Sequence, residues 1–182
     1  MFDSLINDVT IKQILRDNPN LQSANGLTPL MIYCSQGDLE VVRRLLQNGA
    51  VIDKLNDSGQ CCMHFAARSG NSLLVQCLLD CHVPVNRKDC NQEEPIHKAI
   101  ISRDLKTVNL LIARGVQLNG LVNGRTLLML ALEMDDNLIF KALLNSGADP
   151  TIVGSHNCTV HQLAQESNNR KMLDLLEKNK HR

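Results

Sequence analysis

The chain has 182 residues, a length that suits one domain of ordinary size. Hydrophobic residues make up 43% of the chain and charged residues 21%, a composition too apolar for a disordered protein. The 19 basic residues balance the 19 acidic ones and neither half of the chain is polarised, which argues against bulk electrostatic binding to nucleic acid or to an anionic membrane.

Aromatic side chains are scarce. The chain has one tyrosine, three phenylalanines and no tryptophan, too few for the stacking platforms that bind single-stranded nucleic acid. Its seven cysteines are an odd number, and its first residues show no signal peptide. The longest uncharged apolar run, 127–132, is far too short to span a membrane. We therefore expect an intracellular protein, cytoplasmic and/or nuclear, with reduced thiols.

The first 25 residues predict a capping segment. Residues 10–13 are typical of a capping box that opens a helix, because a threonine is followed three places later by Gln13. Asn18 and Pro19 end this helix. We expect residues 1–25 to form an N-terminal capping half-repeat in front of the units that follow.

Residues 26–58 predict two short helices and a turn. Thr28 is suited to cap a helix, and Pro29 fits the first helical turn, where its missing N–H has no cost. Gly37 ends this helix near residue 36. A second helix then carries apolar residues on one face at helical spacing and ends at Gly49. An extended stretch leads from there to a polar turn at 56–59.

The same pattern returns four times along the chain. The position of Thr28 recurs at Cys61, Glu94, Thr126 and Thr159, at steps of 33, 33, 32 and 33 residues. The predicted units are therefore 26–58, 59–91, 92–123, 124–156 and a C-terminal capping unit at 157–182. One such unit cannot bury its apolar face alone, so the units are expected to stack into an all-α solenoid.

This pattern resembles the ankyrin repeat. The motif T-P-L-H-x-A of that family appears in part at residues 28–31 and again at 94–99. The resemblance covers residues 26 to about 178, and it implies stacked helix pairs with β-turn fingers along one edge. The second unit departs most from the family, because Cys61 and Cys62 stand in place of Thr-Pro. Cys61 thus stands where other units place a better helix cap.

Few residues suggest chemistry. The sequence contains no phosphate-binding loop, nucleophile elbow or zinc-protease motif, so we expect no enzyme, no catalytic residues and no cofactor. His64 and His97 occupy the histidine column of the family motif. We interpret them as side chains that hydrogen-bond to neighbouring turns, with a base or metal ligand as the alternative. Five cysteines gather in the second unit, and a zinc or redox site there is a second alternative: Cys61, Cys62, Cys77, Cys81 and Cys90.

Asn86 and Asn119 share one column of the repeat, preceded by Val85 and Leu118. This arrangement resembles the ankyrin asparagine that asparaginyl hydroxylases modify, but the usual acidic residue two places earlier is missing. We interpret both asparagines as structural turn residues.

The finger-tip column predicts a binding surface. Family members commonly have lysine or arginine there, whereas this chain has Leu55, Lys88, Leu121 and Val153, with Val122 beside the third. Exposed aliphatic residues on stiff turns suit a protein interface. The alternative is that each tip folds back on its neighbour. The other predicted partner-binding residues lie at the helix ends and on a polar rim: Arg68, Ile101, Arg125 and Met134.

We therefore predict a non-catalytic protein-binding module that binds neither nucleic acid nor membrane, as a monomer or as a subunit of a hetero-complex. Its size and repeat number resemble those of small all-ankyrin cell-cycle regulators. This resemblance implies a regulatory subunit of a protein kinase complex that controls DNA replication or mitotic entry. The alternatives are a stoichiometric inhibitor of a cyclin-dependent kinase or of a transcription factor, and a zinc- or redox-regulated adaptor.

Overall fold

The computed structural model describes residues 18–179, except for the side chain of residue 156. The helix predicted within residues 1–17 lies outside the described residues. The described chain folds into paired short helices with almost no strand, the one β-bridge joining Val122 to Arg125. The predicted all-α solenoid is confirmed, while the exact boundaries of its units stay predictions.

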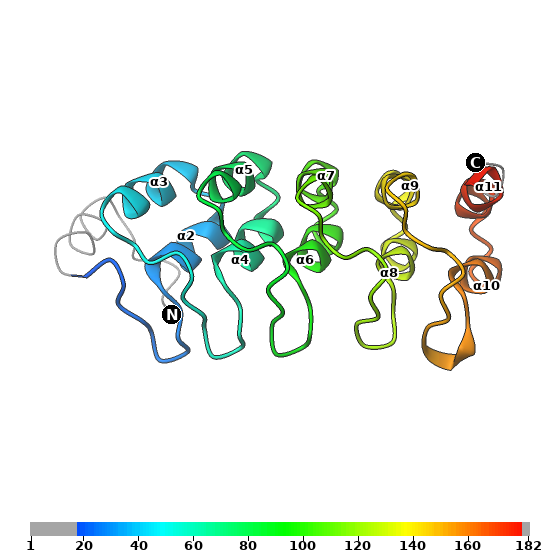
Figure 1. Ribbon diagram of the computed structural model, residues 1–182, viewed down its shortest axis with the longest axis horizontal. Helices are drawn as coiled ribbons and strands as arrows, with labels where there is room; N and C mark the ends of the chain where they lie inside the picture. The colour runs from blue at the N-terminus through cyan, green and yellow to red at the C-terminus, as the bar shows by residue number, and fades with distance from the viewer. Residues whose placement is uncertain (1–17, 180–182) are drawn as a thin grey trace.

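Each pair consists of a first and a second helix. The first helices are α2 (Pro29–Gln36), α4 (Cys62–Ser69), α6 (Pro95–Ile101), α8 (Leu127–Glu133) and α10 (Val160–Glu166). The second helices are α3 (Leu39–Gln47), α5 (Ser72–Asp80), α7 (Leu105–Ala113), α9 (Asn137–Asn145) and α11 (Arg170–Asn179). Figure 1 shows the pairs side by side in one row, with first helices in one layer and second helices in the other. We number the repeats 1 to 5 by these pairs.

Caps place both ends of α2 and the start of α8 as the sequence predicts. The Thr28 hydroxyl accepts a hydrogen bond from the Met31 N–H at 3.2 Å, and Thr126 does the same for Met129. Such a cap contributes about 1 kcal/mol. Gly37 follows α2 in the left-handed conformation, with φ of 73°, where a residue with a Cβ atom would be strained.

A turn projects from the edge of the row in front of each pair, and we call these turns fingers. They are finger 1 (23–27), finger 2 (56–60), finger 3 (89–93), finger 4 (122–125) and finger 5 (154–158). In each, the first residue donates its N–H to the carbonyl of the last, as Asn56 does to Gln60 at 3.0 Å. Finger 5 contains the 3-10 turn η1 (Ser155–Asn157). In Figure 1 the fingers hang along one edge, below the first helices.

One column of leucines forms the centre of the core. Leu45, Leu78, Leu111 and Leu143 lie in successive second helices and are fully buried. Because every repeat adds one leucine to this column, each repeat covers the apolar face of its neighbour. The core is therefore continuous through the stack, as the repeated leucine pairs predict.

Tyr33 departs from the column that it occupies. The other first helices have a fully buried alanine there, such as Ala66. Tyr33 is large, and its buried hydroxyl lacks a hydrogen-bond partner among residues 18–179. Burial raises the pKa of Tyr33, and the charge of Asp38 raises it further. The phenol therefore stays neutral.

We expect Tyr33→Phe to leave stability unchanged or to raise it by up to about 1 kcal/mol, because the substitution removes only an unpaired buried hydroxyl. Urea unfolding followed by circular dichroism measures the change. A loss above about 1 kcal/mol would contradict the expectation, since that is the size of a hydrogen bond lost.

Candidate protein-binding surface

The four predicted tip residues hold equivalent positions in the structure. Leu55, Lys88, Leu121 and Val153 each directly precede the first residue of a finger. Finger 4 is one residue shorter than the others. The residue that is missing from the 32-residue step of the repeat is therefore missing from this turn, after Leu121. We call these four residues the tip row.

The apolar members of the tip row are exposed to solvent. Leu55 exposes 37% of its surface, Leu121 50% and Val153 46%. Ile101, at the end of α6, exposes 45%. Val122 and Met134 are half-buried. Within residues 18–179, these three tip residues therefore leave between a third and a half of their surface open to solvent.

Charged side chains make up the rest of the predicted surface, with Lys88 in the tip row, Arg125 in finger 4 and Arg68 in α4. Arg68 and Lys88 are exposed and form no ion pair in the described part of the chain, 18–179. The Arg125 Nε atom lies 3.0 Å from a carboxylate oxygen of Glu133, with both side chains exposed. Exposed pairs of this kind contribute about 0–1 kcal/mol and exchange partners easily. These cations are thus available to a partner.

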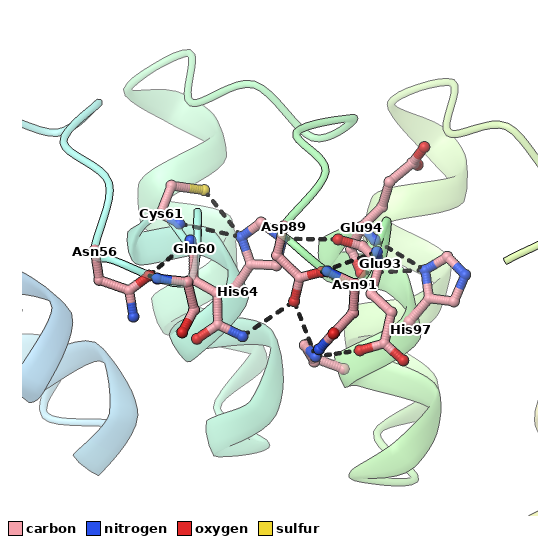
Figure 2. Close-up of polar contacts among 11 residues, drawn as sticks. Asn56, Gln60, Cys61, His64, Asp89, Asn91, Glu93, Glu94 and His97 are labelled. Carbon is pink, nitrogen blue, oxygen red and sulfur yellow. Dashed lines mark hydrogen bonds and ion pairs between the residues drawn. The ribbon is translucent and has the colours of Figure 1, made fainter. Parts of the chain in front are cut away.

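A buried carboxylate holds fingers 2 and 3 together (Figure 2). The Asp89 Oδ1 atom accepts hydrogen bonds from the N–H groups of Asn91 and Glu93, and its Oδ2 atom accepts one from Gln60 Nε2 at 3.1 Å. Lys98 forms ion pairs with both Asp89 and Glu93. Burial pushes the pKa of Asp89 up, but the hydrogen bonds and Lys98 outweigh it and hold that pKa below its usual value. Asp89 is therefore a structural anion.

The two histidines are structural. Nδ1 of His64 accepts from the Cys61 N–H at 3.2 Å, so the ring proton sits on Nε2, which donates to the Glu93 carbonyl at 3.1 Å. The predicted bond to a neighbouring turn is thus confirmed for His64. His97 accepts from the Glu94 N–H at 3.0 Å. Burial lowers the pKa of both rings, which keeps them neutral.

The cysteines are dispersed between core and surface. Cys34, Cys61 and Cys62 are buried, and burial raises the pKa of each thiol. A higher pKa lowers the thiolate fraction and with it the reactivity. Cys81 and Cys90 are exposed. Within residues 18–179, no three His, Cys, Asp or Glu side chains gather where they could hold a metal ion.

The asparagine column links successive loops. The Asn119 side chain accepts from the Asp149 N–H at 2.8 Å and donates to the Gly147 carbonyl at 3.4 Å. Asn20, one period before Asp53, makes the same two contacts with Val51 and Gly49. This supports the structural interpretation of Asn119 and adds Asn20, which the sequence analysis missed.

Glu94, the residue before α6, is buried, which the sequence analysis did not predict. It stands where Thr28 and Thr126 cap their helices and exposes 6% of its surface. Its Oε2 atom has no hydrogen-bond partner in the part of the chain that the structure describes. Burial raises its pKa, and the positive charge of Lys88 partly opposes that shift. Figure 2 shows its carboxyl group pointing away from the Asp89 cluster.

A family model decides the classification. Models of ankyrin repeats in three copies match residues 4–89 and 63–154. The chain belongs to the ankyrin repeat family. Its histidines, caps and fingers are therefore those of an ankyrin solenoid, and ankyrin repeats mark a protein–protein interaction module.

The chain is similar to short segments of several longer proteins. It is 32% identical over 150 residues to the nuclear factor NF-kappa-B p105 subunit of Gallus gallus, covering 75% of this chain and 15% of that protein. It is 36% identical over 95 residues to the mouse protein fem-1 homolog A-like, covering 51% and 14%. It is 33% identical over 93 residues to a probable 26S proteasome regulatory subunit, p28, of Saccharomyces cerevisiae, covering 50% and 41%. The chain thus spans less than half of each of these relatives.

No helix among residues 18–179 combines the length and the apolar character that crossing a membrane requires.

Proposed function

We propose that the chain is a non-catalytic intracellular binding module whose partner protein docks on the tip row. The observation that carries the proposal is the exposure of Leu55, Leu121 and Val153, which are 37%, 50% and 46% exposed on rigid turns. Interfaces gain most of their energy from such apolar anchors within a polar rim. Ile101 and Met134 extend the apolar area, and the rim consists of Arg68, Lys88 and Arg125.

The partner that we propose is a protein kinase complex of the cell cycle, acting in DNA replication or mitotic entry. What supports this choice is the resemblance in size and repeat number to small all-ankyrin regulators of the type of the insect embryonic protein Plutonium. The alternatives are stoichiometric inhibition of a cyclin-dependent kinase and masking of a transcription factor. Binding without catalysis agrees with histidines whose pKa is lowered by burial and whose Nδ1 atoms accept backbone hydrogen bonds.

The triple variant Leu55→Lys, Leu121→Lys, Val153→Lys is expected to lose the partner. Three new charges would be buried unpaired in the complex, which costs several kcal/mol in total and lowers the affinity by more than about 100-fold. Stability in the free chain should change little, since exposed substitutions typically stay within about 0.5 kcal/mol each. Affinity capture from extracts of dividing cells, with mass spectrometry of the retained proteins, compares the variant with the wild type.

The matched control is Leu73→Lys with Leu138→Lys. These leucines are 68% and 65% exposed and lie near the starts of α5 and α9, away from the fingers. The double variant should therefore retain the partner. A kinase retained by the wild type and the control but lost by the triple variant supports both parts of the proposal. A transcription factor retained in its place contradicts the kinase partner. Equal capture by all three proteins contradicts the tip row.

A further inference from the structure

Backbone hydrogen bonds join neighbouring fingers into a ladder. The Asp57 N–H of finger 2 donates to the Asn25 carbonyl of finger 1 at 3.2 Å. The Cys90 N–H of finger 3 donates to the Ser58 carbonyl of finger 2 at 2.9 Å. In each case the second residue of one finger bonds to the third residue of the finger before it.

The ladder resumes at finger 5 but is missing between fingers 3 and 4. The Ser155 N–H donates to the Gly124 carbonyl at 2.7 Å, which joins finger 5 to finger 4. The equivalent bond between fingers 3 and 4 would run from the Asn123 N–H to the Asn91 carbonyl. No hydrogen bond joins these two fingers, although both lie wholly within the described residues. Figure 1 shows the fingers of α6 and α8 standing well apart.

The short turn of finger 4 is one reason for the gap. Its ends bond to each other in both directions, Val122 N–H to Arg125 at 2.9 Å and Arg125 N–H to Val122 at 3.0 Å. Asn123 and Gly124 both have positive φ, 51° and 73°, as a two-residue hairpin turn of type I′ requires. A turn that is closed this tightly does not extend to the finger before it.

Gln92 is a second and independent reason. Gly26, Gly59 and Gly124 occupy the left-handed position of fingers 1, 2 and 4, and there the next finger comes very close. A Cβ atom on Gly26 would lie 2.9 Å from the Asp57 nitrogen, and one on Gly59 would lie 3.3 Å from the Cys90 nitrogen.

Finger 3 has Gln92 at this position, with φ of 62°. By equivalence with Gly26 and Gly59, we infer that its Cβ atom stands where the following finger would pack. The other finger without a glycine at this position is finger 5, with Asn157, and no finger follows it in the described chain.

Other polar links are also sparse at this boundary. Repeats 2 and 3 share the Gln60–Asp89 and His64–Glu93 bonds, and a bond from the Ser102 hydroxyl to the Ala67 carbonyl at 3.1 Å. Repeats 4 and 5 are joined by the bond of Ser155 to Gly124 and by that of Asn169 to Asp135.

Between repeats 3 and 4, the contacts of Asn119 with Gly147 and Asp149 are the only hydrogen bonds in the described residues, and they lie in the outer loops. Within the described chain, His97 makes no hydrogen bond toward repeat 4, although its counterpart His64 bonds to repeat 3.

We propose that the boundary between repeats 3 and 4 is a joint, at which repeats 1–3 and repeats 4–5 move and open as two bodies. Apolar packing across α6 and α8, from residues such as Ile100 and Leu128, holds the two bodies in contact. Such packing is not directional, so it tolerates rocking that the hydrogen-bonded ladder elsewhere resists. In a repeat protein, each boundary has its own coupling energy, and opening occurs first where that coupling is weakest.

Native-state hydrogen exchange of the full chain, followed by mass spectrometry, tests the joint. The amides of α8–α11 are expected to exchange together and faster than those of α4–α7, with the step between α7 and α8. The closing variant combines Gln92→Gly with one serine inserted between Asn123 and Gly124, which reproduces the length and the Ser-Gly pair of finger 2. It should slow the exchange of α8–α11 by at least about fivefold, the effect of one restored hydrogen bond.

The matched control is Asn157→Gly, which changes the same position in finger 5, where no finger follows. It should leave the step unchanged. The reverse variant, Gly59→Gln, should break the bond between Cys90 and Ser58 and create a second step between α5 and α6. Equal exchange of α4–α7 and α8–α11 in the wild type, a step at another boundary, or a reverse variant without a new step would each overturn the proposal.

Discussion

Glu94→Thr is expected to raise the stability of the chain by about 2 kcal/mol at neutral pH. The substitution removes a buried carboxyl group whose Oε2 atom has no partner. It also restores a threonine like Thr28, whose hydroxyl caps the N–H three residues later at 3.2 Å. In a chain of this length the gain corresponds to a rise in Tm of about 4–8 °C.

The gain should depend on pH in one direction. Burial raises the pKa of Glu94, so the folded state holds the proton more tightly than the unfolded state. Its favourable contribution is then fully present below the unfolded-state pKa and is lost as pH rises through the folded-state pKa. The difference between Glu94→Thr and wild type should therefore be smallest near pH 4 and grow toward neutral pH. Urea unfolding at a series of pH values measures it.

Glu94→Gln is the matched control for the charge. It keeps the size of the side chain and removes the titrating group, so its difference from wild type should grow with pH in the same way. The difference in stability between Glu94→Thr and Glu94→Gln should not depend on pH, because only the threonine variant gains a threonine cap. A destabilised Glu94→Thr protein, or a gain equal at pH 4 and pH 8, would contradict the expectation. Either result would mean that the carboxylate finds a partner in solution.

The fold follows from the sequence because its determinants are local and repeated. Thr28 and Thr126 cap their helices and Gly37 ends α2 with a positive φ, each for a reason visible within a few residues. The fixed period then implies stacking, because each apolar face requires a neighbour. Even the position of Leu121 in the tip row can be predicted, because Leu121 lies 33 residues after Lys88 and the shortening of the repeat comes after it, in finger 4.

The consequences of Gln92 and Glu94 cannot be predicted in the same way. The sequence shows a glutamine where other fingers have glycine, but its effect depends on how close the next finger comes, which is a tertiary distance. The sequence also shows a glutamate at a capping position, where a carboxylate turned toward solvent would be harmless. Only the packing decides that Glu94 is buried and that one of its oxygens is unpaired.

The tip row lies on both sides of the joint. Leu55 and Lys88 precede fingers 2 and 3, whereas Leu121 and Val153 precede fingers 4 and 5. A partner that contacts the whole row therefore contacts both bodies. By linkage, such a partner stabilises the arrangement of repeats that it binds, and protection of α8–α11 against exchange should rise with its concentration.

Phe140→Ala is expected to cost about 3–5 kcal/mol, because it empties the site of the largest fully buried side chain. Phe140 lies in α9, at the position that valines such as Val75 occupy in earlier second helices. Because repeats 4 and 5 are joined to the rest mainly by apolar packing, the loss of stability should appear as a separate unfolding transition of these two repeats at low urea. Urea unfolding by circular dichroism should show two transitions, the first with a smaller dependence on urea than the wild-type transition.

Val75→Ala is the matched control, since it empties the same column within the hydrogen-bonded part of the stack. Repeat 2 shares the Asp89 cluster and the finger ladder with repeat 3, so its loss of packing should spread over both repeats and lower the midpoint of the main transition. If Phe140→Ala instead unfolds in one transition with the full urea dependence, repeats 4 and 5 are coupled to repeat 3 as strongly as repeats 2 and 3 are to each other. Because Gln92 and the short finger 4 weaken the coupling between repeats 3 and 4, we expect repeats 4 and 5 to unfold before repeats 1–3.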